Sequence, residues 1–315
     1  MAELLNVTGP TIARPEPASG PDGPPRWRPA TRSPVGAAGA ALGPRWRLIP
    51  SVTILGVIVA AVLVVPPLAG LDQQFVDLAV ANRAPEWAHP FGTDELGRDV
   101  LLRCVYALRV SLAVGLIAAV VSTVIGTAVG AIAGAAGGWT DRLLMRVVDA
   151  VASVPHLLLG IVLVAILGPS LSSVIISIAF THWLSSARIV RSEVLSLRSR
   201  PFIDAAVVGG SSRLRIVARH YLPNVAPQVL LVTTLMVPHA IFHETALSFL
   251  GLGLPPHLAS IGNMLNDGYR SLLIGGWWMS LAPGLAFIIL TLAIAGLGGV
   301  WRDRLNPRRR SELSW

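Results

Sequence analysis

Two histidines and a glutamate lie close together in an otherwise apolar stretch of the sequence. His239 precedes His243 and Glu244 by four and five residues, about one helical turn. The pair His243-Glu244 could begin a zinc-protease motif, but that motif needs a second histidine at position 247, which is Leu. An ionisable group at membrane depth is costly and usually faces a partner or water. These residues therefore line a transport path, or Glu244 is a paired residue that locks a helix bundle; both interpretations stay open.

A second group of ionisable side chains contains the carboxylates of Asp94, Glu95 and Asp99. Hard cations bind clustered oxygen ligands, so this group could suggest a cation site. Arg98 and Arg103 lie beside the carboxylates in the sequence and can pair with them. We therefore expect a structured cap near the external mouth of a path rather than a metal site.

The usage of cysteine and lysine excludes other chemistry. Cys104 is the only cysteine, so it can form neither an internal disulfide nor a thiolate cage for a metal. All 25 basic residues are Arg. The phosphate-binding loop of ATPases needs a Lys, so ATP would have to be bound by another polypeptide. We predict no catalytic residue and no metal-binding residue in this chain, and expect that it is not an enzyme.

The composition indicates a membrane protein. The chain is 53% hydrophobic and 13% charged, whereas soluble domains carry about 25% charged residues. Six apolar segments each approach the roughly 20 residues that a spanning helix needs. We predict an all-α integral membrane protein with about six transmembrane helices, at 48–70, 108–134, 145–167, 170–187, 226–250 and 279–301.

The ends of the chain differ from this apolar part. Residues 1–47 are rich in Pro and Arg and cannot bury enough apolar surface to fold, so we predict a disordered cytoplasmic tail rather than a signal peptide. Residues 306–315 form a basic tail. If the N-terminus is cytoplasmic, 20 of the 25 arginines lie inside, which predicts cytoplasmic termini. The net charge of +8 forms no continuous basic face, so no nucleic-acid partner is expected.

Glycines and a proline predict details of helix packing. Gly126, Gly130, Gly134 and Gly138 recur at every fourth residue, which lets another helix approach closely along one face. Asp149 follows Arg146 by three residues, which predicts an ion pair on one helix face. Pro155 is expected to bend the third span.

The longest polar internal segment, 188–225, predicts a helical hairpin. Pro201 suits the first turn of a helix, and Gly209 and Gly210 can end it in the left-handed conformation. Ser211 or Ser212 can cap a second short helix, expected at 213–221 and stopped by Leu222-Pro223. Small residues in the first helix allow another protein surface to approach closely.

This hairpin resembles the signature loop of ABC importer permeases. The similarity rests on 204–206 (DAA), Gly210 and 220–224 (HYLPN). The family's loop begins Glu-Ala-Ala, so Asp204 is a departure that keeps the charge, and His220 is typical of the peptide-type members. The resemblance implies that an ATPase docks on Asp204, Ala205, Ala206, Gly210, His220, Leu222 and Pro223.

Four further segments extend the resemblance over most of the chain after residue 48. They are similar, in order, to motifs of the C-type permease subunit of dipeptide, oligopeptide and nickel transporters. The segments are 89–99 (HPFGTDELGRD), 246–253 (ALSFLGLG), 262–265 (GNML) and 302–308 (RDRLNPR).

The resemblance implies the type I ABC importer transmembrane fold and a bacterial plasma-membrane location. The chain would form half of a path for di- or oligopeptides, opened by alternating access. The implied partners are a B-type permease, two ATPase subunits that hold ATP and Mg²⁺, and an extracytoplasmic binding protein that meets 71–107 and 251–278. The chain itself would bind no cofactor. Alternatives are import of nickel or another small solute, an ion-driven secondary transporter, and a membrane enzyme.

Overall fold

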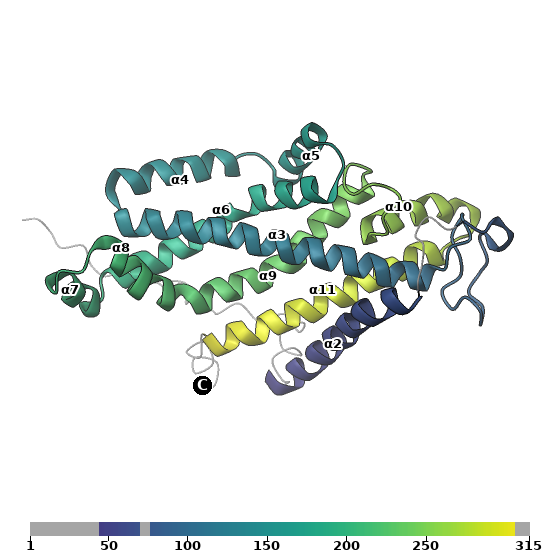
Figure 1. Cartoon of the computed structure of the whole chain (residues 1–315), viewed down its shortest axis with the longest axis horizontal. Coiled ribbons are helices and arrows are strands. Elements are labelled where there is room, and N and C mark those ends of the chain that lie inside the picture. The colour runs from purple at the N-terminus through teal and green to yellow at the C-terminus, as the bar shows by residue number, and fades with distance from the viewer. Residues whose placement is uncertain (1–43, 70–75, 306–315) are drawn as a thin grey trace, which may run out of the picture. The chain divides into compact units, whose positions relative to one another are not determined.

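A computed structural model describes residues 44–69 and 76–305. Every regular element in these ranges is a helix, and Thr93 and Asp99 add an isolated β-bridge (Figure 1). Residues 1–43, which contain most of the predicted N-terminal tail, and the predicted tail 306–315 lie outside the described residues. Residues 44–47, expected to belong to that tail, form the first turn of a helix instead.

The helices follow one another along the chain without intervening strands in the described ranges. Their bounds are α2 Pro44–Ala69, η1 Leu78–Val80, α3 Val100–Ala136, α4 Gly138–Ala152, α5 His156–Leu167, α6 Leu171–Arg198, α7 Pro201–Val208, α8 Arg213–Ile216, η2 Val217–Tyr221, α9 Leu222–Phe249, α10 Ile261–Ser271, η3 Leu272–Ile274 and α11 Trp278–Leu305.

Five helical segments of the described chain are long and apolar enough to cross a membrane, and a sixth arises if α4 and α5 form one span. The axes of α4 and α5 are bent by 83°. The break spans residues 153–155, and Pro155 is the N-cap residue of α5, so the bend predicted at this proline is confirmed. The third span, expected as one helix over 145–167, is therefore two helices.

Two spans are longer than their apolar cores suggested. α3 begins at Val100 rather than near 108, because the Asp99 carboxylate accepts a hydrogen bond from the backbone N–H of Leu102 at 2.9 Å and caps the helix. α6 continues past the predicted end at 187 to Arg198, because Val190 and Val194 of its last turns pack on neighbouring helices.

The glycine stripe of α3 packs against α6. A methyl group on Gly126, Gly130 or Gly134 would come within 3.0 Å of atoms of α6, so the predicted close helix approach is confirmed at these three positions. Gly138 does not belong to the stripe: it begins α4 at φ +58°, directly after Gly137 at φ +65°. The stripe ends at Gly134 because α3 ends before the fourth glycine is reached.

α4 lies along α6 and is joined to it by ion pairs. Arg191 binds both carboxylate oxygens of Asp141, with Nη2 2.6 Å from Oδ2. Arg188 Nη2 lies 2.9 Å from Asp149 Oδ1. Asp149 thus pairs across two helices, whereas the sequence predicted a pair with Arg146 on its own helix.

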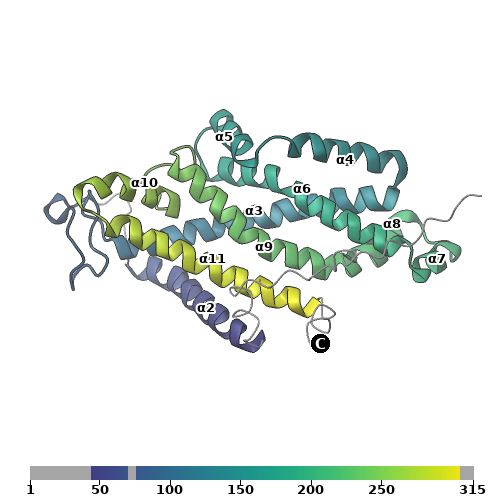
Figure 2. The same ribbon diagram turned by 180° about the vertical axis from the view of Figure 1, so that it is seen from behind.

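α11 packs between α2 and α9, as views from both sides show (Figures 1 and 2). Buried apolar residues of α2, α3, α9, α10 and α11 form one core, and residues of α3, α5, α6 and α9 form a second. α3 and α9 contribute to both, so they are the central helices that position the candidate sites.

Candidate functional site: the α7–α8 hairpin and the polar groups of α9

The hairpin forms as its residue types predict. Pro201 lies in the first turn of α7, and Arg200 before it is extended. The N–H of Gly209 donates to Ala205 O at 2.9 Å, and Gly210 has φ +75°, a backbone conformation that glycine adopts without strain. Ser212 caps α8 by accepting from the N–H of Arg215. The left-handed turn is confirmed at Gly210 only, because Gly209 has φ −71°, and the serine cap is confirmed at Ser212.

The predicted stop at Leu222-Pro223 is wrong. The chain stays helical from α8 through the π-helix η2 into α9, and the N–H of Leu222 donates to Val217 O, five residues earlier. Pro223 falls in the first turn of α9, where its missing N–H is tolerated because the wider π-turn has shifted the bonding pattern. The Asn224 amide also donates to His220 O at 2.6 Å. The hairpin is therefore continuous with α9 rather than separated from it.

The inner face of the hairpin is apolar and buried. Ile203 of α7, Ile216 of α8 and Tyr221 of η2 are each at most 6% exposed. They form one cluster with Ala131 of α3 and with valines of α6 and α9. This packing attaches the hairpin to three long helices.

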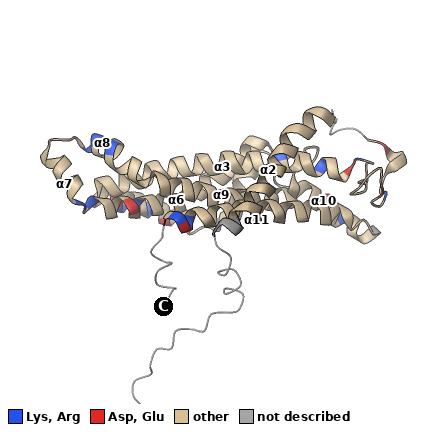
Figure 3. Cartoon of the chain, turned by 90° about the horizontal axis from the view of Figure 1, so that it is seen from below, with Lys and Arg blue, Asp and Glu red and all other residues tan. Residues whose placement is uncertain are grey.

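The outer face of the hairpin is exposed and carries small, apolar and basic side chains. Five of the seven predicted docking residues are exposed, whereas Ala206 and His220 are half-buried. Val208 and Leu214 are 89% and 79% exposed, and arginines colour this end of the chain blue (Figure 3). A Cβ added at Gly210 would have no atom within 4 Å. The surface is open to a second protein.

Glu244 belongs to a buried hydrogen-bond network. Its carboxylate is fully buried and accepts from Ser111 Oγ of α3 at 2.7 Å and from Ser248 Oγ of α9 at 2.9 Å. The two serines accept in turn from the backbone N–H groups of Ile261 and Leu254. Glu244 thus joins α3, α9 and the start of α10, as expected of a residue that locks the bundle.

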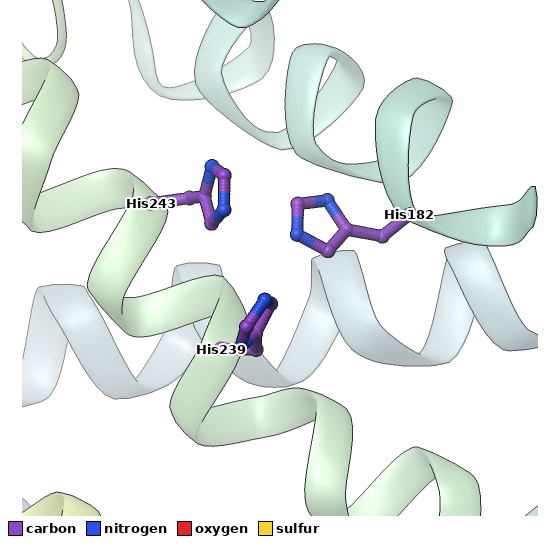
Figure 4. A group of neighbouring side chains, drawn as sticks. All are labelled: His182, His239 and His243. Atoms are coloured by element: carbon purple, nitrogen blue, oxygen red, sulfur yellow. The ribbon is translucent and has the colours of Figure 1, made fainter. Parts of the chain in front are cut away.

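His239 and His243 point away from this network, toward α6. The ring centroid of His182 on α6 lies 5.5 Å from that of His239 and 4.4 Å from that of His243 (Figure 4). His156, the first residue of α5, lies 5.6 Å from His182. The structure therefore separates Glu244 from the two histidines with which the sequence grouped it. His182 and His156 were missed; their signal was that four of the seven histidines fall in or beside apolar spans.

The carboxylates of the segment 89–99 are used for structure. Asp94 lies 2.7 Å from Arg98 Nε and 2.5 Å from Arg103 Nη1, which confirms the predicted pairing with arginines. Ser271 donates to Glu95 Oε1 at 2.7 Å. Asp99, besides capping α3, lies 2.9 Å from His89 Nδ1. These bonds build a folded cap, defined here as residues 77–103 with α10.

Residues 126–311 match the family model described as the binding-protein-dependent transport system inner membrane component. The chain belongs to this family. It is 41% identical over 234 residues to the dipeptide transport system permease protein DppC of Bacillus subtilis, covering 74% of this chain and 73% of that protein. It is 40% identical over 265 residues to the oligopeptide transport system permease protein OppC of Escherichia coli K12, covering 83% and 87%.

A chain of the MetNI methionine ABC transporter, solved in inward-facing conformations, has the same fold. It aligns with a TM-score of 0.54 at 19% sequence identity and covers 64% of this chain and 96% of that one. The predicted all-α, type I ABC importer transmembrane fold is confirmed. The chain is a multi-pass membrane protein and a permease component of an ABC importer.

Proposed function

We propose that this permease forms half of a path for di- or oligopeptides, opened by ATPase subunits that dock on the α7–α8 hairpin. The observation that carries the proposal is the two-sided character of the hairpin: its inner face is packed on α3, α6 and α9, and its outer face is open. The peptide class is supported by the names of the relatives, which are peptide, dipeptide and oligopeptide permeases. The nickel and ion-driven alternatives find no such support.

The mechanism that follows is mechanical coupling through packed helices. A docked ATPase moves when it binds and hydrolyses ATP, and the hairpin moves with it. Because α8, η2 and α9 are continuous, a displacement of the hairpin is passed directly to the helix that carries His239, His243 and Glu244. The spans then rock between outward-open and inward-open arrangements.

The remaining partners and the orientation are part of the same proposal. A B-type permease supplies the other half of the path, and two ATPase subunits hold ATP and Mg²⁺, which this chain does not bind. Both termini and the hairpin face the cytoplasm of a bacterium. The cap faces the opposite side, where a substrate-binding protein delivers the peptide. His239, which is exposed, stays a candidate to line the path, whereas the burial of Glu244 favours the locking role.

Gly210→Trp tests the docking surface. A Cβ at this position would meet no atom within 4 Å, and the new side chain projects from the proposed contact. We expect normal membrane insertion, loss of ATPase co-purification and loss of peptide uptake. Gly168→Trp is the matched control, because Gly168 has a similar φ of +81° and equally open surroundings in the α5–α6 connection. Retention of the ATPase by the Gly210→Trp complex would contradict docking at this surface.

The cargo is tested separately by growth. A deletion strain should fail to use di- and oligopeptides as the sole source of a required amino acid and should recover when the gene is restored. Its uptake of nickel should be unchanged. Loss of nickel uptake with normal growth on peptides would contradict the peptide assignment without affecting the docking result.

A further inference from the structure

The imidazoles of His182, His239 and His243 converge from two helices. His182 comes from α6, and the other two occupy successive turns of one face of α9 (Figure 4). Their nearest ring nitrogens all lie within 4.8 Å of one another. Around a bound zinc, with Zn–N distances of about 2.0–2.1 Å, tetrahedral ligand nitrogens are about 3.4 Å apart. The three nitrogens must approach one another further to reach this spacing, and His239 is the exposed residue of the three.

The hydrogen bonds of His182 prepare it to bind a cation. Its Nδ1 lies 3.0 Å from Ile178 O and 2.8 Å from Thr181 Oγ1. A carbonyl oxygen can only accept, so this contact places the ring proton on Nδ1 and leaves the lone pair on Nε2. Nε2 is buried and has no hydrogen-bond partner, and the residue is only 5% exposed. Histidine ligands of metals commonly donate their other N–H to a backbone carbonyl in this way.

We propose that His182, His239 and His243 bind one divalent cation of the zinc class and thereby tie α6 to α9. Imidazole nitrogen suits zinc, and three protein ligands with an open fourth position form a known zinc arrangement. The fourth position would be filled by water, since His156 does not join the close group. This replaces the expectation that the chain holds no metal-binding residue. The proposal does not depend on the cargo or on the docking surface.

The unsatisfied Nε2 gives the site a physical reason. A buried polar atom without a partner is less stable than a hydrogen-bonded one, and a bound cation removes that cost. Entry is available from the side of His239, because that residue is exposed. A cation held between α6 and α9 would also restrict their relative movement, so zinc should slow uptake.

The experiment measures zinc binding by the transporter complex, purified in detergent with an affinity tag that contains no histidine. We expect one Zn²⁺ per permease chain by competition with a chromophoric chelator, and the intense visible absorption of tetrahedral Co²⁺ when cobalt is used instead. Mg²⁺, which prefers oxygen ligands, should not compete. In H182Q, H239Q and H243Q, affinity should fall by about 100-fold or more, since losing even an outer-shell partner of a metal ligand costs about 10–100-fold.

H257Q is the matched control, because His257 is exposed and lies outside the cluster. It should keep the wild-type affinity, and Zn²⁺ should raise the melting temperature of both proteins. If H182Q is poorly folded, H239Q carries the test, because its side chain is exposed. Equal zinc affinity in H239Q and the wild type would overturn the proposal. The proposal would also be overturned if the wild type bound no zinc while H182Q, H239Q and H243Q changed peptide uptake. That result would assign the histidines to the substrate.

Discussion

The hairpin and the cap lie toward opposite ends of α3 and are held by different forces. The hairpin is held by apolar side chains, chiefly Ile203, Ile216 and Tyr221. The cap also has apolar contacts through α10 and the start of α3, but it adds buried ion pairs: Asp94 contacts both Arg98 and Arg103, and Arg103 Nη2 lies 3.3 Å from Asp267 Oδ2 of α10. In one region the contacts are non-directional, and in the other their geometry is specified by ion pairs.

This difference suggests how the permease divides its work. Apolar packing depends on area rather than angle, so the hairpin can follow a moving partner while it stays attached to α9. Charged hydrogen bonds hold the start of α3 and α10 in one arrangement. We infer that the cap is the fixed region and that the hairpin is the driven one.

The largest effect is expected in the cap, for Asp94→Ala. The substitution leaves the buried Arg103, only 9% exposed, without its closest carboxylate. Breaking a buried pair by removing one partner costs about 3–5 kcal/mol. The thermal unfolding of the purified complex should therefore move to a much lower temperature.

Glu86→Ala is the control for that prediction, because the Arg83–Glu86 pair has side chains 49% and 45% exposed. An exposed pair contributes about 0–1 kcal/mol, so the melting temperature of the Glu86→Ala complex should barely change. Similar losses in the two variants would mean that the cap is not held by its buried charges.

A smaller effect is expected in the hairpin, where the lost contacts are apolar rather than charged. Ile216→Ala removes a buried side chain and should cost about 2–5 kcal/mol. Leu214→Ala, two residues away, removes an apolar side chain that is 79% exposed and should leave stability nearly unchanged. Leu214→Ala should instead weaken co-purification of the ATPase.

Unfolding and co-purification measured on both variants separate the two faces of the hairpin. If Leu214→Ala destabilises the chain as much as Ile216→Ala, then the outer face is not open in the assembled transporter. The contrast between a packed inner face and a docking outer face would then be lost.

Local residue chemistry allowed much of the hairpin to be predicted. Pro201 and Gly210 act through their own backbone preferences and Ser212 through a local side-chain cap, so one sequence is enough to place them. The continuity through Pro223 could not be predicted, because proline normally ends a helix and the π-turn that accommodates it depends on the packed neighbours.

The polar groups of α9 show where sequence reasoning stops. His239, His243 and Glu244 are neighbours in sequence, but Glu244 bonds to α3 while the histidines meet His182 of α6. Which face of α9 meets which helix is a tertiary property. The apolar runs predicted that the spans exist, yet they could not predict that α4 and α5 meet at 83° or that Asp149 would pair with Arg188.

The smallest effect is expected for Ser111→Ala, on α3, whose side chain donates to Glu244 of α9. The variant removes one of the hydroxyl donors to the buried Glu244 carboxylate and one link between α3 and the start of α10. Leaving a buried acceptor short of a donor costs about 1–3 kcal/mol, so we expect a modest fall in melting temperature. Peptide uptake per folded complex should be unchanged if Glu244 only locks the helices. A loss of uptake without a loss of stability would instead place Glu244 on the path, and the division between a fixed cap and a driven hairpin would have to include a functional site between them.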